Sequence, residues 1–137
     1  MEKGTRNAIM FPKKAFSQFV ADDGDVALKL SYVGPQASAT VEVSAAGDIL
    51  FKHGAAGAEA ADSTIQIGST AGTIDVSNAA GNTFGEVVDH INRSGNWKAY
   101  LVGALRADSS DASTGSLLAM SATTISPLKA SSPLGTA

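Results

Sequence analysis

Cysteine is absent from the 137 residues of this chain. This excludes disulfide bridges, thiolate-bound zinc and a thiol nucleophile, because each of them needs a sulfur. No apolar run approaches the roughly 20 residues that a membrane helix requires. The start of the chain has only Ala8 to Phe11 as an apolar run, where a signal peptide needs about 7 to 15 residues. We therefore expect no membrane partner and synthesis in the cytoplasm.

Charge and aromatic residues are also scarce. Charged residues make up 17% of the chain, the net charge is -3, and the Lys and Arg residues are scattered, so we expect no direct contact with nucleic acid. Aromatics reach only 6%, so the core must be thin and built mainly from Val, Ile and Leu. A thin core makes a marginal monomer, which neighbouring subunits can stabilise. The composition favours a single domain that packs against other protein molecules.

The pattern of the first half of the chain predicts β-strands. Residues 26–32 alternate apolar and polar side chains, and residues 39–43 do the same, which is the period of half-buried strands. Ala46-Gly47-Asp48 predicts a turn into a return strand over 49–52, so the second and third strands should form a hairpin. Residues 54–62 show no periodicity and predict a loop or a flexible edge connection.

The second half adds short β-segments and a helix. Residues 64–67 and 73–76 flank a Gly-rich stretch and predict a small hairpin. Thr83 and Glu86 have the spacing of a capping box, and an apolar stripe at Phe84, Val87, Val88 and Ile91 follows, so the sequence predicts a helix over about 83–92.

Residues 97–125 are predicted to form the last two strands of the domain. Residues 97–106 alternate with apolar residues on both faces, which predicts a long central strand. A polar turn over 108–116 and a last strand over 117–125 follow. We expect a β-rich α+β fold, an antiparallel sandwich or barrel-like sheet with one capped helix. The domains are then an N-terminal arm over 1–24, a core over 25–125 and a flexible C-terminal tail over 126–137.

One stretch carries a resemblance. From Thr73 to about Thr124 the order is a short strand, a Thr-capped helix ending in Ile91-Asn92, a turn with Gly95, a long strand and a returning strand. This order resembles the "IN" motif of flagellins and flagellar hook-associated proteins. The long terminal helices of those filament proteins are missing here, and an acidic chain of this length rich in Ala, Gly and Thr looks like small structural proteins of tailed-bacteriophage virions. The resemblance implies a shared supersecondary unit and a structural role.

No residue set predicts a chemical reaction or a bound metal. His53 and His90 lack a second ligand at helical spacing, so structural roles are favoured for both. Asp22, Asp23 and Asp25 lack the glutamate that completes a calcium-binding loop, and Asp108 and Asp111 are interpreted as turn residues. We therefore expect no enzyme activity, no catalytic residue and no cofactor.

Six residues are candidates for contact with a capsid or with other subunits. Aromatic residues in the arm would be costly to expose unless a neighbour covered them, and the tail offers two leucines. Trp97 can be interpreted as a core residue or as an interface anchor, because large aromatic side chains are common in both places. The core position is favoured. The candidates are Phe11, Phe16, Phe19, Trp97, Leu128 and Leu134.

The function that these observations favour is structural. We expect a decoration or cement protein of a bacteriophage virion, assembled in the host cytoplasm, that binds the major capsid protein and forms a homo-oligomer, for which we expect a trimer. Many weak linked contacts would then stabilise the shell. Alternatives are a head-tail connector or tail component, a carbohydrate-binding or adhesin module, and a hydrolase that uses Asp108 and Asp111.

Overall fold

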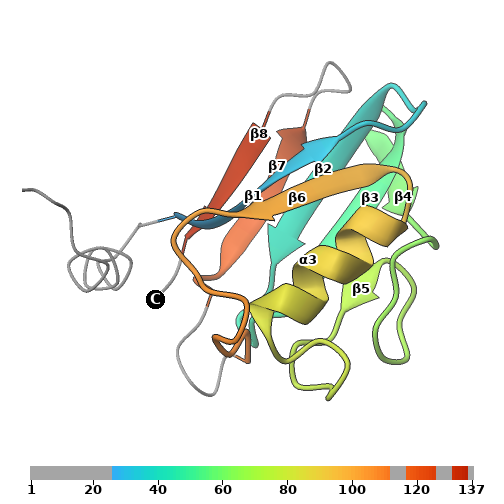
Figure 1. The fold of residues 1–137 in the computed structure, drawn as a ribbon. Helices are drawn as coiled ribbons and strands as arrows, with labels where there is room; N and C mark the ends of the chain where they lie inside the picture. The colour runs from blue at the N-terminus through green and yellow to red at the C-terminus, as the bar shows by residue number, and fades with distance from the viewer. Residues whose placement is uncertain (1–25, 112–116, 126–130, 136–137) are drawn as a thin grey trace, which may run out of the picture.

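The computed structural model describes residues 26–111, 117–125 and 131–135. Figure 1 shows two stacked antiparallel sheets and one helix, α3. This confirms the predicted β-rich α+β fold, and the sheets do not close into a barrel. Within these ranges, no helix has the length and apolar character needed to cross a membrane. The arm over 1–24 lies outside the described residues.

The smaller sheet has three strands in the order β6-β1-β8. The central strand is β1 (Val26–Tyr32), flanked by β6 (Trp97–Leu101) and β8 (Ser131–Gly135). The residues of β1 alternate toward the core as their period predicts, and Leu28, Leu30 and Tyr32 are buried. The alternation in the sequence therefore located both the strand and its inner face.

The larger sheet has the order β4-β3-β2-β7, and β5 also pairs with β3. Strands β2 (Ser38–Val43) and β3 (Ile49–Ala55) form the predicted hairpin, with Val43 opposite Ile49. The other strands of this sheet are β4 (Ala58–Ala61), β5 (Thr73–Ile74) and β7 (Met120–Ile125). The side chains of Val41, Ile49 and Phe51 from this sheet are fully buried.

Helix α3 (Phe84–Arg93) lies beside β6 (Figure 1). The capping box is present as predicted: Thr83 Oγ1 accepts from the amide of Glu86, and the Glu86 carboxylate accepts from the amide of Thr83. The amides of Phe84 and Gly85 donate to the carbonyls of Asp108 and Arg106. All the free amides of the first turn are therefore satisfied within the protein.

The Ile-Asn pair at the end of α3 has two separate roles. Ile91 is fully buried, whereas the Asn92 side chain reaches the outer edge of β6. Asn92 Nδ2 donates to the carbonyl of Ala99 at 2.9 Å, and Asn92 Oδ1 accepts from the Ala99 amide at 2.8 Å. One side chain thus takes the place of a missing neighbouring strand at this position.

Several predicted elements are wrong in extent or place. Strand β6 ends at Leu101 and is an edge strand of its sheet, not a long central one, because Asn92 and α3 take the position of a further strand. Residues 54–62 are not a loop: β3 runs to Ala55 and turns at Gly57 into β4, which pairs with it. Alanine-rich strands lack the apolar alternation that pattern reading needs.

Two further predictions need correction. The segments 64–67 and 73–76 do not form a hairpin, since Ile67 and Ile74 meet in a single parallel bridge and β5 pairs with β3 instead. Residues 131–135 of the predicted flexible tail form β8, which pairs with β1. Pro133 is compatible with this strand because proline is tolerated at a sheet edge. Residues 126–130, 136 and 137 lie outside the described residues.

Replacing Asn92 tests its role at the sheet edge. In Asn92→Ala the polar groups of the nearly buried Ala99 lose both partners, so we expect a loss of about 1 to 3 kcal/mol in the free energy of unfolding. Urea denaturation measures this value. Arg93→Ala, at the next and exposed position, serves as the control and should change stability by less than about 0.5 kcal/mol. Equal effects of the two substitutions would contradict the role assigned to Asn92.

Candidate interaction surface

The most concentrated polar cluster surrounds a buried carboxylate, Asp62, which is only 1% exposed. Thr64 donates to Asp62 Oδ1 from its amide at 3.0 Å and from its hydroxyl at 2.6 Å. Asp62 Oδ2 accepts from Asn96 Nδ2 at 3.1 Å and from Trp97 Nε1 at 2.8 Å. Both carboxylate oxygens are therefore occupied by donors of the protein itself, as a buried charge requires.

These bonds fix the ionisation of Asp62. Burial raises the pKa of this carboxyl group, but the hydrogen bonds from Thr64, Trp97 and Asn96 outweigh burial and hold its pKa below the ordinary aspartate value. Asp62 is therefore a carboxylate at neutral pH. A base that accepts four hydrogen bonds has little capacity left to take a proton from a substrate.

His53 and Tyr32 extend this cluster toward the surface. Tyr32 Oη lies 3.0 Å from His53 Nδ1 and also accepts from the amide of Gln36. His53 Nδ1 is 3.7 Å from Asp62 Oδ2, which is longer than a hydrogen bond. The pair thus lacks the Asp-His hydrogen bond of a catalytic triad. The contacts support the structural role favoured for His53.

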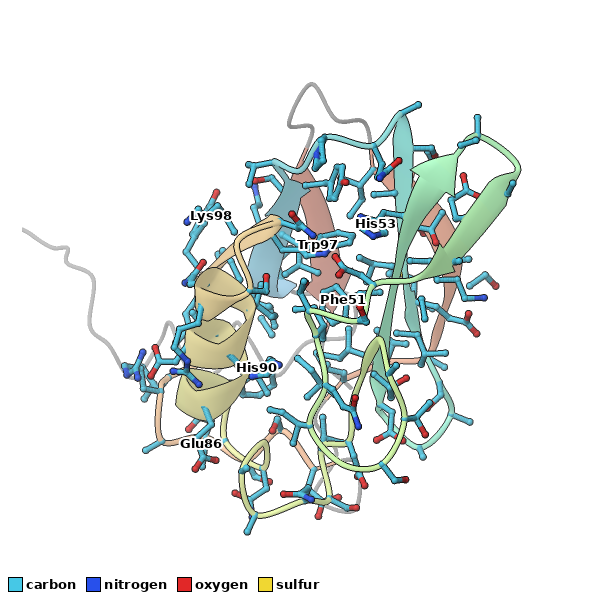
Figure 2. The ribbon with its side chains drawn as sticks, turned by 90° about the vertical axis from the view of Figure 1, so that its right-hand side faces the viewer. Phe51, His53, Glu86, His90, Trp97 and Lys98 are labelled. Atoms are coloured by element: carbon cyan, nitrogen blue, oxygen red, sulfur yellow. The ribbon has the colours of Figure 1, made fainter. Side chains whose placement is uncertain are left out.

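Three aromatic rings pack together at the Trp97 donor of this carboxylate, and Figure 2 labels two of them, Trp97 and Phe51. The Trp97 ring makes edge contacts with Phe51, at 5.0 Å between centroids, and with Tyr32, at 4.9 Å. Phe51 comes from β3 and the other two rings from β6 and β1, so the cluster joins the two sheets. Trp97 is fully buried, which confirms the core position and contradicts its use as an interface anchor.

His90 occupies a separate position on α3. Its Nε2 accepts the amide of Gln66 at 3.0 Å, which only an unprotonated Nε2 can do. Burial and the nearby Arg93 lower the pKa of His90, so the ring is neutral at pH 7. This contact connects the helix to the loop before β5 and again supports the structural interpretation.

The remaining acidic candidates are placed as follows. Asp108 Oδ2 accepts from the amide of Leu105 at 2.9 Å and closes a turn, as predicted. Asp22, Asp23 and Asp25 lie outside the described residues. Within residues 26–111, 117–125 and 131–135, no group of three His, Asp or Glu side chains is arranged to hold a metal ion.

Large apolar side chains are exposed on β6 and on the segment that follows it. Tyr100 is 56% exposed, Leu105 57% and Val102 40%, and these are the large hydrophobic side chains that stand out among the described residues. We call these three residues the β6 surface. Lys98, also exposed on β6, and Lys29, opposite Tyr100 on β1, place positive charge beside it. Exposed apolar residues rimmed by charge are typical of protein contact sites.

The segment that carries the β6 surface is held firmly. The amide of Val102 donates to the carbonyl of Ala27 at 2.9 Å. Arg106 forms a two-bond ion pair with Asp89 of α3, with distances of 3.2 and 2.6 Å. The buried Ser110 donates from its hydroxyl to the carbonyl of Gly81. A partner would therefore meet a preformed surface and lose little entropy in ordering it.

The sequence contained a pattern that indicates this surface, but the pattern was interpreted as a central strand. Tyr100 and Val102 alternate with the core-facing Trp97, Ala99 and Leu101, and a second apolar face was taken to mean a central strand. The structure leaves that face uncovered. The other predicted contacts cannot be placed in the same way: Phe11, Phe16, Phe19 and Leu128 lie outside the described residues, and Leu134 is located only by its backbone, opposite Leu28.

Comparison with known proteins identifies no relative. No family model matches the sequence, no curated protein matches it, and no solved structure matches the fold. Evidence about function therefore comes from the residues described above.

Asp62→Asn tests the buried cluster. The amide cannot accept as the carboxylate does, so we expect a loss of about 2 kcal/mol or more at pH 7 and a shift in Trp97 fluorescence. Because folding lowers the pKa of Asp62, its contribution is complete above the ordinary pKa of about 3.9 and is lost as the pH falls through the folded-state value. The difference between wild type and variant should shrink below that pH. A pH-independent difference would contradict this account.

His90→Gln tests the contact with Gln66. Folding lowers the pKa of His90, so its stabilising effect is complete above the ordinary value of about 6.5 and declines as the pH falls through the folded-state pKa. Wild type should therefore lose more stability between pH 7 and pH 5 than the variant, in parallel urea titrations. An NMR titration that placed the pKa of His90 above 6.5 would show the assignment to be wrong.

Proposed function

We propose that this chain is a non-enzymatic structural protein of a bacteriophage virion, a decoration or cement protein that binds across the major capsid protein lattice and stabilises the shell. The observation that carries the proposal is the β6 surface: three partly exposed apolar side chains on a firmly held segment. The buried carboxylate of Asp62 is hydrogen-bonded within the protein. The exposed side chains of the β6 surface are available for contact with a partner.

The resemblance of the helix and strand to a unit of filament and virion proteins supports the same class. Two residues that carry the resemblance stabilise the fold here. Ile91 is buried in the core, and Asn92 hydrogen-bonds the edge of β6. Such a unit builds a durable scaffold and leaves the neighbouring face free for a partner. The low net charge of -3 is compatible with packing against other protein.

Each contact through the β6 surface would be weak. The three side chains are already partly covered, so burying each one contributes on the order of 1 kcal/mol. Attachment at many lattice positions, or by linked copies, raises the effective affinity without new chemistry. The arm with Phe11, Phe16 and Phe19 would add contacts that form on binding.

Immunogold electron microscopy of purified virions from the phage that encodes this chain tests the location. We expect many labels distributed over the head. Labels confined to the tail or the neck would overturn the decoration role in favour of the alternative of a tail or connector component. Absence of the chain from purified particles by mass spectrometry would overturn the virion assignment altogether.

A binding assay tests the surface. Empty shells of the same phage lacking this chain should bind the wild-type protein and then withstand higher temperature. Tyr100→Ser combined with Leu105→Ser should reduce binding on the order of tenfold, as the loss of about 1.4 kcal/mol implies. Ser69→Ala with Thr70→Ala, in the exposed turn before β5, is the matched control and should bind as wild type. Equal binding by both variants would contradict the assignment of this surface.

A further inference from the structure

The edges of the two sheets differ in how they are protected against pairing with another strand. Unpaired amides and carbonyls at a sheet edge attract further strands, and proteins block them with charges, prolines, short strands or covering groups. At β6, the Asn92 side chain occupies the polar groups of Ala99. Strand β4 has only four residues and carries Glu59. Strand β8 contains Pro133.

Strand β7 (Met120–Ile125) is less protected than these edges, although its register with β2 shifts at one bulge. It pairs with β2 on one side, and no pairing is found on its other side among the described strands. It has no proline and no charged residue, and the sequence from 112 to 128 contains neither Lys, Arg, Asp nor Glu. Residues 121–124 are exposed, so both faces of the strand are open there.

We propose that the free edge of β7 pairs antiparallel with β7 of a second copy, which joins two five-stranded sheets across a two-fold axis. A second copy is the favoured occupant because the strand is uncharged, so two identical edges meet without like-charge repulsion, whereas the chain as a whole carries -3. Thr123 and Thr124 are β-branched and suit cross-strand pairs.

The pairing must be short. Ser121 and Ala122 both stand opposite Glu42, because the register shifts between Val41 and Val43, and this bulge leaves only Thr123–Ile125 in regular register with β2. A two-fold contact of this length gives a weak dimer. Such a dimer suits attachment at linked lattice sites, and in this respect the inference deepens the proposed function.

Single cysteines provide a sharp test because the chain has none of its own. Each of the residues 121–124 is replaced in turn by Cys in the full-length protein, which is then oxidised. Residues directly opposite across an antiparallel pair lie at about 4.5 to 5.5 Å between Cα atoms, within disulfide reach, and the separation grows steeply away from the axis. We expect the yield of disulfide dimer to peak at one position and fall on both sides. Thr70→Cys, on an exposed turn, is the control and should give little dimer.

Charge on the edge gives the second measurement. Thr123→Lys with Thr124→Lys should weaken the dimer on the order of tenfold in sedimentation equilibrium, while Thr70→Lys leaves it unchanged. Uniform cross-linking along 121–124, or no cross-linking above the control, would overturn the proposal. A chain that labels virions but shows no β7 pairing would overturn only this inference, and a β7 dimer absent from virions would overturn only the proposed function.

Discussion

The hydrogen bond from the Trp97 indole to the Asp62 carboxylate is the contact on which the rest of the fold depends. It lies where β6, β3 and the segment after β4 meet, and three aromatic rings pack together there. A buried charge is stable only when its oxygens are fully paired, so Thr64, Asn96 and Trp97 must all be in place together. A thin core with few aromatic residues gains a single well-defined packing from this requirement.

The same arrangement determines which side chains are buried and paired and which are exposed to a partner. The polar groups with the most unusual environments face inward and are paired, while the outward face of β6 presents Tyr100 and Val102. In the proposed structural role, a partner would be recognised through shape and apolar area at the surface. The ion pair between Arg106 and Asp89 and the bonds of the capped helix keep that surface in one conformation.

Local signals in the sequence predicted much of the fold. The Thr83-Glu86 spacing located the helix, and the alternation in 26–32 and 39–52 located β1 and the hairpin, because each pattern is determined within a few residues. The place of β6 at an edge could not be read, since it depends on Asn92 and on strand order. Asp62 gave no signal either: it follows an alanine-rich stretch, and Asn96 and Trp97 are more than 30 positions away.

The bonds between Asn92 and Ala99 also constrain what can bind beside the helix. Because the backbone groups of β6 at this point are already taken, an incoming chain cannot extend this sheet there. A partner on the Tyr100 face must instead be recognised through its side chains and its contour. Such a partner could contact this face with a helix, a loop or the face of another sheet, because recognition through side chains does not require a strand of a particular direction.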